Sequence, residues 1–111
     1  MAVTRRQFRQ IALSFAETEA KSHMGHPDFR VAGKIFATLG YPDATCGMVK
    51  LTPIEQRMFV EAEPKAFQPC DGAWGRRGAT SVKLSDVKKA TLRRALEAAW
   101  EFAAPRRLAN R

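Results

Sequence analysis

Four short segments with strand character follow one another between residues 20 and 51, and this succession constrains the fold more than any other feature. Pro27, Gly33 and the turn Gly40-Tyr41-Pro42-Asp43 interrupt the region before any part is long enough for a stable helix. Consecutive strands joined by short turns pair antiparallel. The pattern therefore predicts strands at Ala20–Gly25, Asp28–Val31, Lys34–Leu39 and Cys46–Leu51.

Helix signals flank this region on both sides. Thr4 and Gln7 have the spacing of a capping box, which predicts a helix from Arg5 to about Ser14. Thr52-Pro53-Ile54-Glu55 combines a capping threonine, a proline at the first helical position and a glutamate three residues after the cap. This is the clearest local signal in the chain, and it predicts a helix over Pro53–Ala62.

The C-terminal part supplies the last elements. Phe67–Cys70 has extended character, Gly72–Gly78 has the composition of a loop, and Ala79–Leu84 that of a strand. Ser85 is a suitable N-cap for a helix over Asp86–Ala103.

The resulting order, α-β-β-β-β-α-β-α, is typical of an α+β protein. We expect one compact domain over residues 1–111. Its sheet should be antiparallel or mixed with about five strands, and its helices should pack on one face.

The net charge of +8 is concentrated in residues 71–111, which carry +6. Such a segment suits a polyanion partner, because each neutralised phosphate releases counterions; a role in solubility alone is the alternative. No apolar run could span a bilayer and no signal-peptide pattern opens the chain, so we expect a cytoplasmic protein. Cys46 and Cys70 are expected to be buried thiols rather than a disulfide.

Strand alternation offers a first binding surface. If the apolar set Ile35, Ala37, Leu39, Val49, Leu51, Val82 and Leu84 faces the core, the opposite face carries Lys34, Phe36, Met48, Lys50, Ser81 and Lys83. Cations interleaved with an aromatic ring could contact phosphates and stack on a base. The alternative is that a loop or a partner subunit covers Phe36 and Met48.

Trp74-Gly75-Arg76-Arg77-Gly78 offers a second surface. Its glycines permit tight turns, so Arg76 and Arg77 could project from a loop tip and reach phosphates. The alternative is structural: Trp74 seals the core, and one arginine stacks on its ring or pairs with Asp71.

His23 and His26 with Asp28 come nearest to a metal site, but we expect none, because residues three apart on a strand face opposite sides. We expect His26-Pro27-Asp28 to form a turn in which Asp28 or a backbone group fixes the imidazole. The chain shows no nucleophile elbow, phosphate-binding loop or paired-carboxylate pattern, so neither catalytic residues nor a cofactor are expected.

Along nearly its whole length the chain resembles the MmcQ/YjbR-like family of small bacterial proteins. The segments that carry the resemblance are His26–Val31 with Gly33–Ala37, Met48–Thr52, Trp74–Thr80, and Ala99-Trp100 followed by Pro105–Leu108. The resemblance implies a compact α+β domain without an established enzymatic activity or cofactor. The family is often described as having a double-wing DNA-binding motif, so the resemblance also implies DNA as a partner.

These observations favour a non-enzymatic DNA-binding protein that acts mainly through phosphate contacts. The residues expected to make them are Arg76, Arg77, Lys34, Lys50 and Lys83, followed by Arg30 and Phe36. We expect a monomer or a weak dimer.

Two alternatives remain open. One is a protein-interaction or chaperone-like module that uses Phe36 and Met48 on the sheet face, because the implied fold is similar to that of small secretion chaperones. The weaker one is a small-ligand pocket around Trp74, His26 and Tyr41.

Overall fold

A computed structural model describes residues 2–109, which form six strands and five helices. In chain order they are α1 (Arg5–Leu13), β1 (Thr18–His23), β2 (His26–Val31), β3 (Lys34–Leu39), β4 (Cys46–Lys50), α2 (Pro53–Ala62), β5 (Phe67–Pro69), α3 (Gly72–Arg76), β6 (Ala79–Lys83), α4 (Lys89–Ala103) and α5 (Arg106–Ala109). The order confirms the expected α+β class.

The six strands form one antiparallel sheet in the spatial order β1-β2-β3-β4-β6-β5. Tight turns at Met24-Gly25 and Ala32-Gly33 join the first three strands, and all four turn residues have positive φ. This backbone twist matches that of paired strands. After α2, the chain adds β5 at the edge and returns through β6, which pairs with both β4 and β5.

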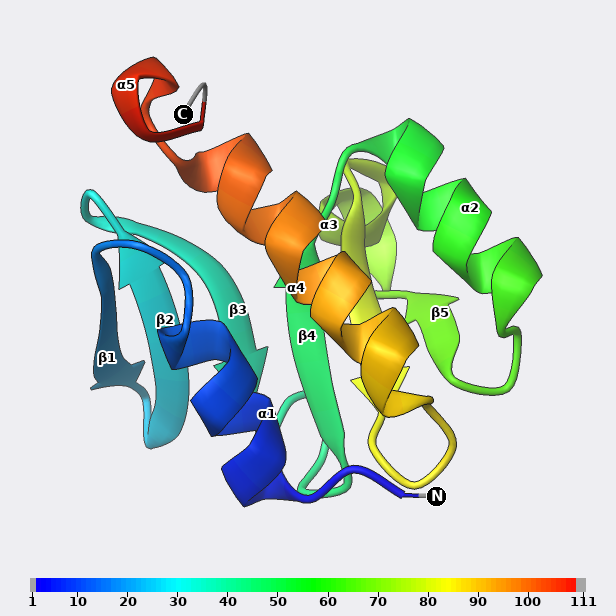
Figure 1. The fold of residues 1–111 in the computed structure, drawn as a ribbon. Coiled ribbons are helices and arrows are strands. Elements are labelled where there is room, and N and C mark those ends of the chain that lie inside the picture. The colour runs from blue at the N-terminus through cyan, green and yellow to red at the C-terminus, as the bar shows by residue number, and fades with distance from the viewer. Residues whose placement is uncertain (1, 110–111) are drawn as a thin grey trace.

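The core lies between the sheet and the helices α1 and α4 (Figure 1). Phe8 of α1 and Leu92 and Leu96 of α4 are fully buried there against Phe29 and Val49 of the sheet. Removal of this apolar surface from water is the main driving force for folding. The opposite face of the sheet, here called the outer face, carries the side chains from which a site can be built.

Both capping boxes are confirmed. The hydroxyl of Thr4 accepts a hydrogen bond from the Gln7 N–H at 3.0 Å, and that of Thr52 accepts one from the Glu55 N–H at 3.2 Å. The observed bounds of α2 and β3 coincide with the predicted ones.

The last long helix begins later than predicted, because Ser85 does not cap it. The Val87 N–H donates to the Lys83 carbonyl at 3.1 Å, so the residues between form a turn, and α4 starts at Lys89. A carboxylate from another part of the chain serves the helix start instead: the Lys88 N–H donates to Glu63 Oε1 at 3.2 Å.

Two further elements differ from expectation. The extended segment near Phe67 is a sixth strand, and Gly72–Gly78, predicted as a loop, contains the helix α3. The five-strand count was therefore one too low.

The prediction that Phe36 lies on the outer face is wrong. A β-bulge shifts the register between β2 and β3, so that Phe29 pairs with Ala37 while the next residue, Arg30, pairs with Ile35. The extra residue interrupts the two-residue alternation. Phe36 and Ala37 therefore both belong to the core, and Ile35 is only partly buried.

Cys46 and Cys70 are both free thiols, Cys46 buried and Cys70 half-buried. Burial raises the pKa of the Cys70 thiol to about 11. Within the described residues, no helix has the length and apolar character required to cross a membrane.

Candidate functional site

Helix α3 brings the second predicted segment onto the sheet, and two glycines allow it to pack there. A Cβ added at Gly75 would overlap the carbonyl oxygen of Cys70, and one added at Gly78 would overlap that of Leu51. Gly78 also has a φ of +115°, which side chains rarely tolerate. Gly75 therefore serves close packing within a helix rather than the tight turn predicted for it.

A buried glutamine holds this arrangement. Gln56 of α2 is 8% exposed, and its side-chain amide donates to the carbonyl oxygens of Gly75 at 2.9 Å and Ala79 at 3.1 Å. The Thr80 hydroxyl lies 3.1 Å from the same nitrogen. One side chain thus links α2, α3 and β6, and no local sequence signal indicated it.

Trp74 does not seal the core. It is half-buried and lies outside the core cluster, with its ring edge-on to Tyr41 at 5.4 Å between centroids. Lys50 Nζ lies 6.0 Å from the centre of the Trp74 ring, within reach of a cation–π contact. One of the cations beside the tryptophan therefore comes from β4.

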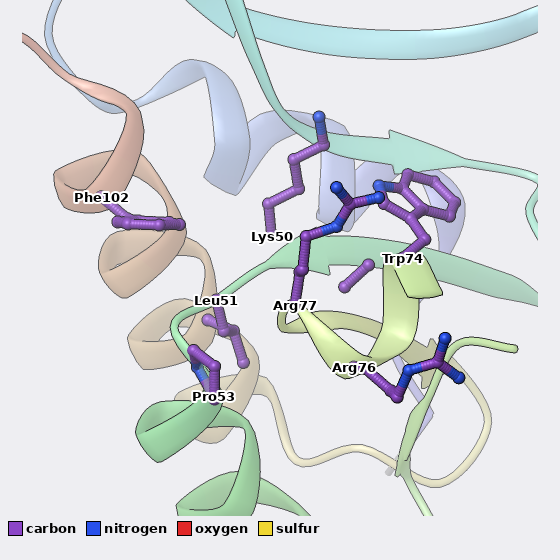
Figure 2. Close-up of a pocket in the computed structure, with 8 residues that line it drawn as sticks. Lys50, Leu51, Pro53, Trp74, Arg76, Arg77 and Phe102 are labelled. Carbon is purple, nitrogen blue, oxygen red and sulfur yellow. The ribbon is translucent and has the colours of Figure 1, made fainter. Parts of the chain in front are cut away.

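The cationic pocket, of about 670 Å³, is lined by Lys50, Leu51, Pro53, Trp74, Arg76, Arg77, Ala79 and Phe102. Figure 2 shows Lys50 and Arg77 extending toward Trp74, whereas Arg76 points away. Among residues 2–109, no carboxylate pairs with any of these three cations. Phe102, near the end of α4, is 57% exposed at this pocket.

Trp74 also lines a second cavity, the histidine pocket, of about 290 Å³. Its other lining residues are His23, Met24, His26, Thr38 and Tyr41. The predicted pocket residues His26, Tyr41 and Trp74 are thus brought together, and Thr38 was missed. Met48, which pairs with Thr38 on the outer face as predicted, is fully buried. It therefore offers no exposed anchor for a partner.

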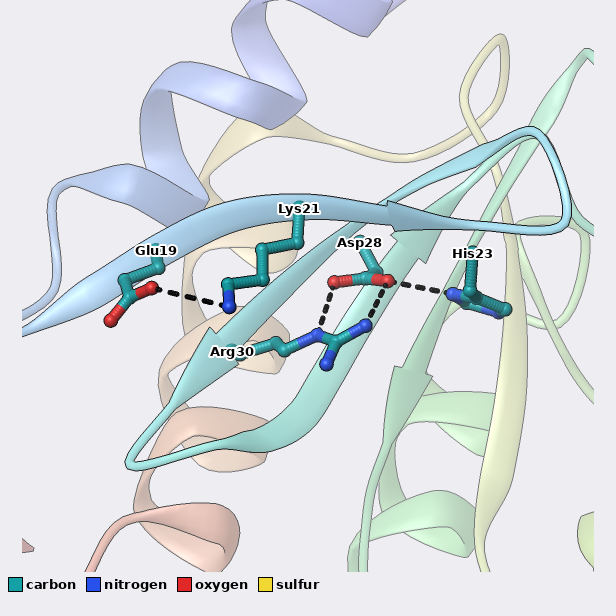
Figure 3. Close-up of polar contacts among 5 residues, drawn as sticks. All are labelled: Glu19, Lys21, His23, Asp28 and Arg30. Atoms are coloured by element: carbon teal, nitrogen blue, oxygen red, sulfur yellow. Dashed lines mark hydrogen bonds and ion pairs between the residues drawn. The ribbon is translucent and has the colours of Figure 1, made fainter.

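Polar side chains of β1 and β2 form a separate network on the same face, drawn in Figure 3. The buried Asp28 carboxylate accepts two hydrogen bonds from Arg30, at 2.8 and 3.0 Å, and lies 2.7 Å from His23 Nδ1. The hydrogen bonds from Arg30 are the main reason that the pKa of Asp28 is below its ordinary value of 3.8, although burial opposes them.

This network corrects the prediction for the histidines and gives Arg30 a partner that was not predicted. Asp28 holds His23 rather than His26, because β2 begins at His26 and the residues that follow it lie in a strand instead of a turn. Arg30 was ranked among the phosphate-binding residues, but both of its hydrogen bonds go to Asp28. Its guanidinium therefore forms an ion pair with Asp28 inside the protein.

The remaining predicted cations lie apart from the cationic pocket. Lys34 is exposed at the β2–β3 turn. Lys83 pairs with Cys46 at the opposite end of β4 from Lys50. In the part of the chain that the structure describes, no three His, Cys, Asp or Glu side chains are arranged to hold a metal ion. The arrangement at Trp74 is thus suited to binding an anion beside an aromatic surface.

Comparisons with known proteins place this geometry in a family. The YjbR family model matches residues 13–102, a range that includes both pockets. The crystal structure of the Deinococcus radiodurans protein DR2400, from the domain family DUF419, has the same fold: the TM-score is 0.74 at 15% sequence identity, over 91% of this chain and 78% of that one. No curated protein matches. Since the family model spans most of the sequence, the chain belongs to the YjbR family.

Proposed function

We propose that this protein binds DNA without catalysing a reaction, mainly through phosphate contacts made by Lys50, Arg76 and Arg77. The observation that supports this proposal most directly is that three cations without an ion-pair partner among residues 2–109 line one open pocket beside Trp74. An unpaired guanidinium or ammonium can replace the counterions of a phosphate without first breaking a salt bridge.

The rest of the molecule supports attraction at longer range. Lys34 and Lys83 are exposed but lie outside the pocket, so they add to the positive field rather than to the contact. The free thiols Cys46 and Cys70 fit a reducing compartment, and we place the protein in the bacterial cytoplasm. The alternative of a protein-binding sheet face has weaker support, because both of its proposed anchors, Phe36 and Met48, are buried.

The test is the binding of a labelled random duplex, followed by fluorescence anisotropy as salt is raised. Contact with about three phosphates predicts a log–log slope of affinity against salt near −2.7. The double variant Lys50→Gln with Arg77→Gln should reduce the magnitude of the slope by about 2.

The matched control is Arg93→Gln with Arg94→Gln, which removes the same charge from exposed positions on α4 that do not line the pocket. It should leave the slope nearly unchanged. Equal losses in both double variants would mean that net charge, and not the pocket, attracts the DNA.

A further inference from the structure

The histidine pocket contains a polar group that the fold leaves without a partner. Thr38 lies in the middle of the sheet and is 2% exposed, and its hydroxyl forms no hydrogen bond with any of residues 2–109. Burial of a hydroxyl without a partner is unfavourable, and a valine of nearly the same shape would avoid the cost. Thr38 lines the cavity, and a ligand there could supply the partner if the pocket wall opens over the hydroxyl, whose oxygen is covered in the structure.

The walls of the pocket suit a flat ring. Tyr41 and Trp74 meet edge to face at 68°, and the rings of His23 and His26 lie 6.5 Å apart at 61°. Aromatic and imidazole rings are the surfaces on which planar heterocycles stack.

The polar groups of the pocket call for a ligand with both a donor and an acceptor. The low pKa of Asp28 keeps this carboxylate ionised at neutral pH, so it can only accept, and His23 Nδ1 must carry the hydrogen between them. In the neutral imidazole the other ring nitrogen is then an acceptor, and the Thr38 hydroxyl can both donate and accept. The described residues that line the pocket include no carboxylate, and the nearby Asp28 is already bound by Arg30 and His23, so an amine would find no free acidic partner among them.

The charge beyond Trp74 indicates what the ring should carry. Trp74 lines both the histidine pocket and the cationic pocket. Lys50, which lies over its ring, and Arg77 could hold a phosphate attached to a group stacked beside Trp74.

We propose that the histidine pocket binds a nucleobase whose phosphate rests on Lys50 and Arg77. This inference rests on the proposed phosphate-binding function and adds a base to it. The same chemistry is supplied by a free nucleotide and by an unpaired nucleotide within a single strand, whereas a base within a duplex is not available to the pocket.

Four probes test the inference at about 50 mM salt. They are a labelled random single strand of about 12 nucleotides, an abasic strand of the same length, the corresponding duplex, and the four nucleoside 5′-monophosphates as competitors. The base-bearing strand should bind about tenfold more tightly than the abasic strand, the size expected for one stacked base.

Thr38→Val should remove most of that preference while leaving the affinity for the abasic strand unchanged. Thr18→Val is the matched control, because the Thr18 hydroxyl is also buried without a partner but lies outside the pocket. It should keep the preference. Thermal unfolding of both variants checks that they fold, and neither should melt below the original protein.

The outcomes separate the two proposals. Equal affinity for the base-bearing strand, the abasic strand and the duplex would overturn the nucleobase site and leave phosphate binding standing. Binding of none of the DNA probes or nucleotides would overturn both. A preference for bases that survives Thr38→Val would also overturn the assignment to this pocket. Competition by monophosphates as strong as that by the strand would identify a free nucleotide as the ligand, and weak competition would identify a single strand.

Discussion

The two ends of the outer face use the same residue types in opposite ways. At the β1–β2 end, Arg30 pairs with the buried Asp28, which also forms a hydrogen bond with His23, so the charge of Arg30 is neutralised within the protein. At the α3 end, Lys50 and Arg77 lie beside Trp74 with no carboxylate paired to them in the described residues. The difference teaches that a cation indicates a binding site only when the fold has left it without a counter-charge.

The largest effect is expected from Gly75, the glycine within α3 that lies against the Cys70 carbonyl. Gly75→Ala would force a methyl group into the Cys70 carbonyl and should lower the free energy of unfolding by more than about 4 kcal/mol. Gly25→Ala, in the β1–β2 turn, faces open space but has a φ of +80°, so it should cost only about 1–2 kcal/mol. Urea unfolding of both variants measures the difference, and similar losses would contradict the close packing of α3.

Asp28→Asn should have the next largest effect. It removes the charge that Arg30 and His23 bind and should cost about 2 kcal/mol at neutral pH. Because the pKa of Asp28 is lowered by folding, its contribution is complete above the ordinary value of 3.8 and is lost as pH falls through the folded value.

Unfolding measured from neutral pH down to acid should therefore bring the stability of this variant closer to that of the original protein. A gap that stays constant to the lowest pH at which both proteins fold would show that the carboxylate contributes by shape rather than by charge.

Thr38→Val should change stability in the favourable direction, by about 1 kcal/mol, since it removes a buried hydroxyl without a partner. Thermal unfolding tests this. A loss of stability would indicate that the hydroxyl has a partner in the folded protein, and the argument for a ligand at this position would fail.

The smallest effect on stability is expected at the cationic pocket. Lys50→Gln with Arg77→Gln should change the free energy of unfolding by less than about 0.5 kcal/mol, because neither side chain forms an ion pair with another described residue. Urea unfolding of the same protein samples that are used in the DNA titration checks this. If this double variant lost as much free energy of unfolding as Asp28→Asn, the cations at the α3 end would be held within the protein like Arg30, contrary to the comparison above.

Sequence reasoning succeeded where a signal is local. The two capping boxes involve residues three apart, and both helices that they predicted begin where expected. The strand Lys34–Leu39 was located correctly. The side of the sheet to which Phe36 points was not, because the bulge that reverses it arises where β3 pairs with β2. The start of α4 was also missed because it depends on a distant residue: the carboxylate of Glu63 accepts a hydrogen bond from the N–H of Lys88.

The candidate site was predicted in part. His26, Tyr41 and Trp74 meet at one pocket, as grouped from sequence. Lys50 lines another with Arg76 and Arg77, although the sequence analysis had assigned Lys50 to the sheet surface and the two arginines to a separate loop. Thr38 and Phe102 were missed, because their roles depend on the burial of a strand position and on the exposure of a residue near a helix end. Sequence analysis also missed that Arg30 binds Asp28, although the two residues are two apart on one strand and their side chains therefore share a face.

By itself, the sequence determined the α+β class, the helix starts at Thr4 and Thr52, and the excess of positive charge, because these depend on near neighbours and composition. Only the tertiary structure decided which cations are free. Lys50 of β4 and Arg77 after α3 come together beside Trp74 because Gly75 and Gln56 pack α3 onto the sheet, and no carboxylate of the described residues pairs with either cation there. These are contacts between distant segments, and a charge is neutralised or left available by what the fold places beside it.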